Sequence, residues 1–481
     1  MNALTKNHLH YLIITMLVFS IILTGYYYID DIGRANLGYT LWSTNGRPVT
    51  EWLFILISQG YPIIDISPMT QIASIFLLGF SATKICEKIP IENAFYKSII
   101  GASFALNPFM IEVLSYRYDS LSMSLSILFA SLAVSIGWNN TCSKKNILLS
   151  VTFILLTMCT YQPSIGIYIS FCVFEVLCKN FKRNYSILET IVRICCLVVA
   201  QLIYMFLITP IFVTGEYNTT HGTLTFNPHD IIQNIKLYYD LFATSYGGAF
   251  YYTYIFMLFA NIALSIKSLI ALKKNTSTNI PTKIFSIIIA ITFPVLIFTS
   301  PFLPLVFLQN PVIAPRVFIS FGATLFISIY SIYHTFKKLG YISLSILLLS
   351  TVSLYFSYSN ALKSQGKLED FYAMKIANII EEQNLQVNTL AIDGYMKYSN
   401  MVLLYGSRFP IIEKTISTAF KKNWMFSAIY LKTYGVNVSF ISNQDSNQAI
   451  TKHCSLTPLV SNGDFSAYRI DNVILISFNK C

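Results

Sequence analysis

From residue 9 to residue 358 the chain alternates long apolar runs with short polar connections. The hydrocarbon core of a bilayer is about 30 Å thick, so a helix needs about 20 apolar residues to cross it. The pattern therefore predicts a polytopic α-helical membrane protein with about eleven spans. These cover residues 9–28, 68–83, 98–114, 121–138, 147–162, 163–178, 191–213, 249–271, 284–303, 312–335 and 339–358.

The apolar stretch from Asn146 to Cys178 is too long for one span and too short for two full ones. Basic residues flank it on both sides, so we expect both of its ends on the same side of the membrane. The chain must then turn back near Tyr161, Gln162 and Pro163. Interrupted spans of this kind often line a cavity or a binding site, which makes Tyr161 and Gln162 candidate substrate-cavity residues.

The pattern changes after Tyr358. Residues 359–481 contain 12 Lys and Arg and 9 Asp and Glu, as a soluble domain would. Periodicity predicts helices over 367–384 and 419–434 and strands over 389–392, 436–441 and 473–478. We therefore divide the chain into a membrane domain, residues 1–358, and a C-terminal α/β domain, residues 359–481.

Composition agrees with a membrane protein. Hydrophobic residues make up 54% of the chain and charged residues only 11%, whereas soluble domains carry about 25% charged residues. The formal net charge of +11 does not indicate a nucleic-acid partner, because no run of Lys and Arg interleaved with aromatic residues is present. The charge lies in short connections, where it orients spans in the lipid.

Lys and Arg favour alternate connections of the membrane domain. The connections that we place in the cytoplasm, together with the span ends that adjoin them, hold 16 of them, and those on the opposite side hold five. Because cytoplasmic loops carry the excess of Lys and Arg, the N-terminus is predicted inside and the C-terminal domain outside. The first run ends in Tyr26, Tyr27 and Tyr28 rather than in small residues, so we expect an uncleaved first span.

Candidate chemistry begins in the first outer connection. Asp30 and Asp31 directly follow the first span, and one of the two can act as a general base toward a hydroxyl group. The alternative is that both are solvated charges at a helix end. Arg34 and Arg47 offer the fork geometry that suits phosphate, or else contact lipid headgroups. Trp42 either stacks on a sugar face or belongs to the interfacial aromatic belt.

Two more outer connections, with the span ends beside them, add charged groups. Glu112 lies in the last turns of a predicted span, where ionisable groups usually face a cavity or a partner. Asp119 either belongs to the same cavity or only caps the next helix. Arg117 lies between them, and Arg316 lies where a later span enters the membrane. Either Arg can hold an anion, and a lipid phosphate diester is the natural anion at that depth.

Nine Cys are present and none has zinc-ligand spacing. Seven are interpreted as small apolar residues of the membrane part. Cys454 and Cys481 fall in the outer domain, so a disulfide is predicted between them. The chain contains no P-loop, no G-x-G-x-x-G and no H-E-x-x-H motif, so chemistry on soluble nucleotides is unsupported.

Several short motifs together resemble a known family, the Gtr type II O-antigen glucosyltransferases of serotype-converting bacteriophages. The motifs span most of the membrane part. They are Asp30-Asp31 with Arg34; Gly38, Trp42 and Gly46-Arg47-Pro48; Asn107-Pro108 with Tyr116-Arg117-Tyr118-Asp119; and Tyr161-Gln162-Pro163. The C-terminal domain contains no matching motif, so acceptor specificity is left open.

The resemblance implies a type C glycosyltransferase of the bacterial inner membrane with a periplasmic C-terminal domain. It would transfer glucose from undecaprenyl-phosphate glucose to the O-antigen of lipopolysaccharide, with an acidic residue of the first outer loop as base. Participation of a divalent metal is left open. We expect Asp30 and Asp31 to line an outer cavity with Arg117, Gln162 and Arg316, and one of the two Asp to be the base.

Two other functions remain as alternatives. An O-antigen polymerase would also work on lipid-linked sugars at the outer face, but it would lengthen the chain instead of branching it. A lipid-linked sugar flippase or transporter would need polar groups at mid-membrane on several spans. The predicted spans are nearly free of charge at their centres, which argues against transport.

Overall fold

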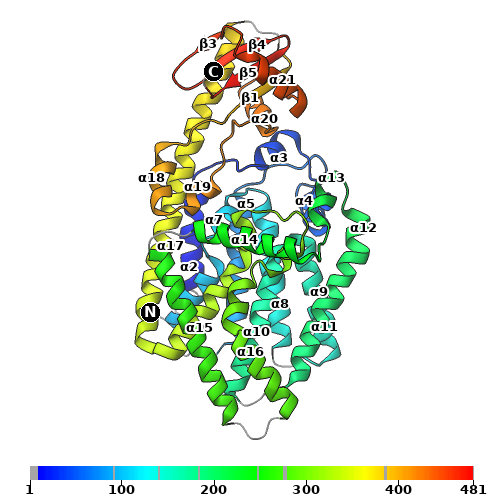
Figure 1. Ribbon diagram of the computed structural model, residues 1–481, viewed down its shortest axis with the longest axis vertical. Coiled ribbons are helices and arrows are strands. Elements are labelled where there is room, and N and C mark those ends of the chain that lie inside the picture. Colours follow the sequence, from blue (N-terminus) through cyan, green and yellow to red (C-terminus); the bar gives the residue numbers. More distant parts are fainter. Residues whose placement is uncertain are drawn as a thin grey trace.

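The structure is a computed structural model that describes residues 9–89, 91, 93–138, 141–182, 185–245, 249–274, 279–383 and 387–479. Long helices form a bundle, and a smaller C-terminal domain that contains the β-strands sits at one end of it (Figure 1). We call this end of the bundle the domain end. Shorter helices lie between the bundle and the C-terminal domain.

The bundle is built from apolar helices. Eight described segments are long and apolar enough to cross a membrane: 69–86, 119–137, 144–182, 187–212, 251–273, 280–299, 315–336 and 341–382. Helix α2 (Leu9–Ile22) and helix α4 (Pro48–Ile57) are shorter apolar helices. The third predicted span is divided into α6 (Ala94–Ala105) and α7 (Met110–Ser115). The predicted count of about eleven spans therefore stays a prediction.

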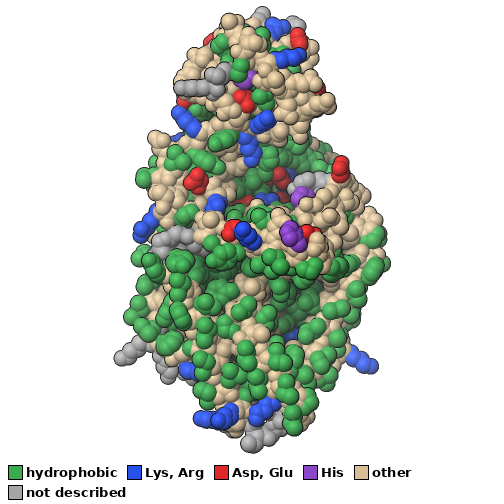
Figure 2. All heavy atoms as spheres, viewed as in Figure 1, with side chains coloured by type: hydrophobic (Ala, Val, Ile, Leu, Met, Phe, Trp, Pro, Cys, Tyr) green, Lys and Arg blue, Asp and Glu red, His purple; other side chains and the backbone are tan. Residues whose placement is uncertain are grey.

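The remaining elements of the bundle follow in chain order. They are α5 (Met69–Cys86), α8 (Asp119–Gly137), α9 (Lys144–Tyr161), α10 (Ile165–Lys182), α11 (Ile187–Ile203), α12 (Thr209–Phe212), α13 (Glu216–Gly222), α14 (Pro228–Ser245), α15 (Ala249–Lys273), α16 (Ile280–Thr299) and α17 (Phe321–Glu382). Figure 2 shows hydrophobic side chains over most of the visible face of the bundle, with charged side chains at its far end and around the domain end. An exposed apolar surface of this extent suits lipid.

The predicted turn at residues 161–163 is present. A short 3₁₀ helix, η2 (Gln162–Ser164), joins α9 to α10. On α9, Phe153 packs against Phe129 of α8, and at the start of α10 the hydroxyls of Ser164 and Ser126 are 2.6 Å apart. Further along α10, Glu175 is joined through Arg193 of α11 to the carbonyl of Val134 near the end of α8. Both helices thus lead away from the turn toward the same end of α8.

Helix α17 also reverses its direction. Asn107 donates to the carbonyl of Ile319, just before α17, at 3.3 Å and accepts a hydrogen bond at its own carbonyl from Tyr355 at 3.4 Å. A straight helix rises about 1.5 Å per residue and would carry these two positions some 50 Å apart. The predicted pair of spans 312–335 and 339–358 therefore corresponds to two antiparallel arms of α17, and the second arm continues into the C-terminal domain (Figure 1).

The C-terminal domain contains a five-stranded sheet in the order β2-β1-β5-β4-β3. Strand β1 (Thr389–Asp393) pairs in parallel with β2 (Ser439–Phe440) and β5 (Val473–Ser477). Strands β4 (Ser466–Ile470) and β3 (Val460–Ser461) complete the sheet in antiparallel pairing. The three predicted strands are confirmed in position, and β3 and β4 were not predicted. The helix predicted from 419 begins only at Phe426.

Four short helices accompany the sheet. They are α18 (Asn400–Arg408), α19 (Ile411–Thr415), α20 (Phe426–Lys432) and α21 (Asn443–His453). Val402, Ile411 and Ile416 belong to the hydrophobic core of the bundle, so α18 and α19 are packed onto the bundle rather than onto the sheet. The predicted Cys454–Cys481 disulfide involves residue 481, which lies outside the described residues, and it stays a prediction.

A buried ionic cluster holds α11 at the end opposite the C-terminal domain. Arg193 lies within α11, buried, with its Nε 2.6 Å from Glu175 of α10. Lys179 bridges Glu175 and Glu189 at 2.7 Å each. Two acids and two bases balance one another, which a low-dielectric interior requires.

Breaking this cluster on one side should destabilise the protein. Removal of one partner of a buried ion pair leaves an uncompensated charge and costs about 3–5 kcal/mol. We expect Arg193→Leu to lower the melting temperature in detergent strongly, and the double change Arg193→Leu with Glu175→Leu to recover most of the loss. An unaltered melting temperature for Arg193→Leu would show that the pair does not stabilise the bundle.

The predicted orientation is testable at two points of the described chain. The bias in Lys and Arg predicts that Glu382 is periplasmic and Lys273 cytoplasmic. Alkaline phosphatase fused after Glu382 should be active, and the matched fusion after Lys273 should be inactive. Green fluorescent protein at the same two sites should give the opposite result. A phosphatase signal only at Lys273 would reverse the orientation.

Candidate active site

The connection after α2 holds a strained backbone just before its first charged residue. Ile29 has a φ of 47°, in the left-handed region. A β-branched residue is an outlier there, and such strain of about 1–3 kcal/mol persists only where the surroundings enforce it. Asp30 follows Ile29, and helix α3 (Asp31–Leu37) begins at the next residue. The strain therefore lies at the start of the predicted site.

Asp31 is fully buried and ties two segments together. Its carboxylate accepts the backbone N–H groups of Tyr28 at 3.3 Å, Arg117 at 2.8 Å and Tyr118 at 3.4 Å. Burial raises the pKa of Asp31 to about 8, although the N–H of Arg117 acts in the opposite direction. The expectation that Asp31 lines an open cavity does not match this geometry, because its oxygens are turned into the protein.

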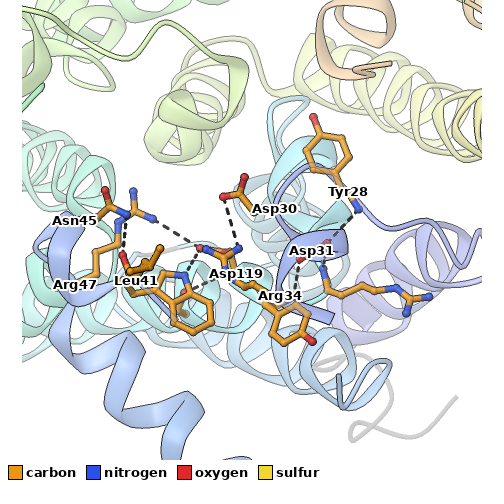
Figure 3. Close-up of polar contacts among 12 residues, drawn as sticks. Tyr28, Asp30, Asp31, Arg34, Leu41, Asn45, Arg47 and Asp119 are labelled. Carbon is orange, nitrogen blue, oxygen red and sulfur yellow. Dashed lines mark hydrogen bonds and ion pairs between the residues drawn. The ribbon is translucent and has the colours of Figure 1, made fainter. Parts of the chain in front are cut away.

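Asp30 differs from its neighbour in exposure and in partners. Its side chain is 40% exposed and lies 3.6 Å from Nη1 of Arg34. Figure 3 shows Asp30 pointing away from the side on which Asp31 meets Tyr28. Burial of the surrounding site raises the pKa of Asp30, and the Arg34 guanidinium offsets part of this effect. A carboxylate that is reachable and more basic than usual has the properties of a general base.

Asp119 is the centre of the charge network around Asp30. The buried carboxylate accepts from Arg34 Nη1 at 2.8 Å and from Trp42 Nε1 at 2.9 Å, and Arg47 Nη1 is 3.7 Å away (Figure 3). Asp119 therefore does more than start helix α8. Trp42 is buried and stacks on Phe54 at 4.6 Å. It is closed to a sugar, which corrects the expectation that it lines a substrate cavity.

A second ion pair lies next to this network. Glu112 of α7 accepts from Arg316 Nη1 at 2.6 Å and from the Arg316 backbone N–H at 2.7 Å. Arg316 belongs to a 3₁₀ helix, η5 (Pro315–Ser320), ahead of α17. Tyr161 lies between the two cations, because its hydroxyl donates to the Arg316 carbonyl at 3.4 Å and the Arg47 guanidinium sits over its ring at 4.7 Å.

Arg47 and Arg316 are the cations that remain partly open. Their side chains are 23% and 27% exposed, whereas the side chain of Arg34 is buried. Among the described residues, Nε of Arg47 is buried without a hydrogen-bond partner. Arginine presents a planar fork of donors that fits phosphate oxygens. The two residues flank Tyr161 in the manner of a two-sided anion clamp.

Two predicted site residues lie apart from this network. Arg117 pairs with Asp65 at 2.6 Å, donates to the Gly25 carbonyl at 2.7 Å and covers the ring of Tyr27. These contacts occupy its guanidinium, so the expected phosphate role does not match its geometry. Gln162 does not face a ligand either, because its amide is bonded within the protein, as described below.

Three residues of the site were missed from the sequence. Asp65 holds Arg117, Tyr116 lies 6.0 Å from the Arg316 guanidinium, and Tyr204 contacts the segment before Arg47. Tyr204 stands inside an apolar run and gave no signal, whereas Asp65 is an acidic residue of the first outer connection and could have been considered with Asp30 and Asp31. Among the described residues, no three His, Cys, Asp or Glu side chains are grouped as metal ligands.

All residues of this network fall in the part of the chain that matches a known family. The model of the family described as "Glucosyl transferase GtrII" matches residues 19–327. The chain belongs to this family. The resemblance inferred from the motifs is thereby confirmed, and membership identifies this GtrII protein as a glycosyltransferase.

One curated relative of this GtrII protein matches along most of its length. It comes from Salmonella phage P22 and is described as "Uncharacterized 55.3 kDa protein in gtrB 5'region". The two are 27% identical over 423 residues, which cover 84% of this chain and 85% of the phage protein. No solved structure matches the chain.

The two adjacent aspartates should respond differently to substitution. We expect Asp30→Asn to lower sugar transfer by about 10²–10⁴-fold, since a general base is lost, while the protein keeps its melting temperature. Asp31→Ala should lower stability by about 1–3 kcal/mol or more, because buried N–H groups lose their acceptor. Transfer assays and thermal unfolding of both variants separate the roles. Full activity of Asp30→Asn together with loss in Glu112→Gln would move the base to α7.

Proposed function

We propose that this protein transfers a glucosyl residue from undecaprenyl-phosphate glucose to the O-antigen of lipopolysaccharide at the periplasmic face of the inner membrane. The observation that carries the proposal is the position of Asp30. This half-open carboxylate lies at the domain end of an apolar bundle, beside a network that includes the partly exposed Arg47 and Arg316. Membership in the GtrII family supports a glucosyl donor.

The proposed reaction needs a base and a cation. The acceptor hydroxyl oxygen forms a bond to C1 of glucose, and its proton passes to Asp30. The bond between C1 and the phosphate oxygen breaks, and its electron pair stays on the phosphate. Arg47 and Arg316 stabilise the charge that develops there, which fixed donors do most effectively in a site with little water.

The charges of the network fit a monophosphate carrier. With Asp31 protonated, the cations Arg34, Arg47 and Arg316 are balanced by the carboxylates Asp30, Asp119 and Glu112. The phosphodiester donor brings one negative charge, and its product gains a second. Asp30 becomes neutral in the same step, so the total charge of the site stays constant.

The location of the network supports a lipid-linked donor. Nucleotide sugars are absent outside the cytoplasm, so a transferase that works there needs a carrier in the membrane. Figure 2 shows charged side chains around the domain end directly beside the hydrophobic surface of the bundle, where a polyprenyl chain is soluble. Transport is less well supported, because the described charges gather at the two ends of the bundle.

Comparison of O-antigen from a host with and without this gene tests the proposal. Mass spectrometry and linkage analysis should show one added hexose per repeat unit, and the Asp30→Asn gene should not add it. The lipopolysaccharide ladder on gels should keep its length in both strains. Loss of the ladder without the gene would indicate a polymerase. Unchanged modification in a host that cannot make polyprenyl-phosphate glucose would exclude the proposed donor.

A further inference from the structure

Tyr204 joins a membrane helix to the segment that carries Arg47. The residue is buried at the start of a π-helical turn, η3 (Tyr204–Ile208), which follows α11. Its hydroxyl donates to the carbonyl of Gly46 at 2.9 Å and accepts from Nε2 of Gln162 at 2.7 Å. π-helical turns inside α-helices are rare and frequently occur at functional sites.

Gln162 and Tyr204 each hold the carbonyl of one of two consecutive residues, Asn45 and Gly46. Nε2 of Gln162 also donates to the carbonyl of Asn45 at 3.2 Å, so the carbonyls of two consecutive residues are held. Gly46 has a φ of 73°, and a Cβ atom there would lie 2.2 Å from the Tyr204 hydroxyl. Only glycine fits this approach. The backbone immediately before Arg47 is therefore fixed from the direction of α10 and α11.

The side chain of Arg47 has weak anchors of its own. Its nearest carboxylate, Asp119, is 3.7 Å away, and the remaining contact is with the face of the Tyr161 ring. Figure 3 shows Arg47 beside Asn45, with its guanidinium directed toward Asp119. A guanidinium held this loosely by its side-chain partners depends on its backbone for its position.

We propose that Tyr204 and Gln162 are positioning residues that place Arg47 against the phosphate of the donor. The proposal rests on the proposed function and deepens it, because it assigns a role in donor binding to the turn at residues 161–163. Tyr161 supports the Arg47 side chain, and the adjacent Gln162 supports its backbone. The turn between α9 and α10 thus builds one wall of the donor phosphate site and does not itself bind the sugar.

A double-mutant cycle tests this coupling. The full-length protein in proteoliposomes is given short-chain polyprenyl-phosphate glucose, and kcat and KM for this donor are measured. Loss of the hydrogen bond to the Gly46 carbonyl in Tyr204→Phe, or to the Asn45 carbonyl in Gln162→Leu, should raise the donor KM about two- to tenfold, with a smaller change in kcat. Each substitution also removes the bond between the two side chains. In an Arg47→Gln background the same changes should have no further effect on KM, since the group they position is gone.

The control is Tyr96→Phe, which removes a buried hydroxyl that donates to the Ile329 carbonyl at 3.1 Å, away from Arg47. It should leave the donor KM unchanged in both backgrounds. If Tyr204→Phe fails to accumulate, the cycle can be completed with Gln162→Leu and Arg47→Gln alone. Equal, additive effects in both backgrounds would overturn the positioning role. An unchanged KM in Arg47→Gln itself would instead overturn the donor phosphate site, and with it that part of the proposed function.

Discussion

The Asp119 carboxylate is the interaction on which the rest of the site depends. It meets Arg34, Trp42 and Arg47, all from the first connection of the chain, at the first turn of helix α8. A buried carboxylate is costly unless it is paired and hydrogen-bonded, and here both of its oxygens are engaged. The same contacts that neutralise Asp119 also fold the connection over the domain end of the bundle. The ion pairs of Asp119 therefore determine the fold of the connection as well as the charge balance of the site.

That fold explains why neighbouring aspartates take different roles. Asp31 accepts the backbone N–H groups of Arg117 and Tyr118, between α7 and α8, and that of Tyr28. It therefore fixes the start of α3 to the bundle. Asp30 is left on the open side, beside Arg34. A helix turns about 100° per residue, so two successive side chains at its start cannot face the same way. One carboxylate becomes part of the scaffold, and the other stays accessible for chemistry.

Sequence patterns predicted the apolar helices, the turn at residues 161–163, three strands and most charged residues of the network, because burial and charge leave direct traces in composition. The contact partners of these residues could not be predicted from the sequence. Whether Trp42 faces sugar or Phe54, and whether Arg117 faces phosphate or Asp65, depends on packing between distant segments. Tyr204 lies in an apolar run where nothing marks its hydroxyl. Strand β3 has two residues and is defined only by its pairing with β4.

Contacts from the C-terminal domain help to hold the strained backbone conformation at Ile29. The hydroxyl of Tyr28 donates to the Thr415 carbonyl, and Phe426 of α20 packs so closely on α3 that a Cβ atom at Gly33 would lie 2.6 Å from its ring. Asp31 holds the same segment from the bundle side. Strain persists where the surroundings over-determine the backbone, and here contacts from the bundle and from the C-terminal part of the chain both do so. Asp30 is thus placed by both domains at once, which explains why its accessible carboxylate needs no strong side-chain partner to keep its position.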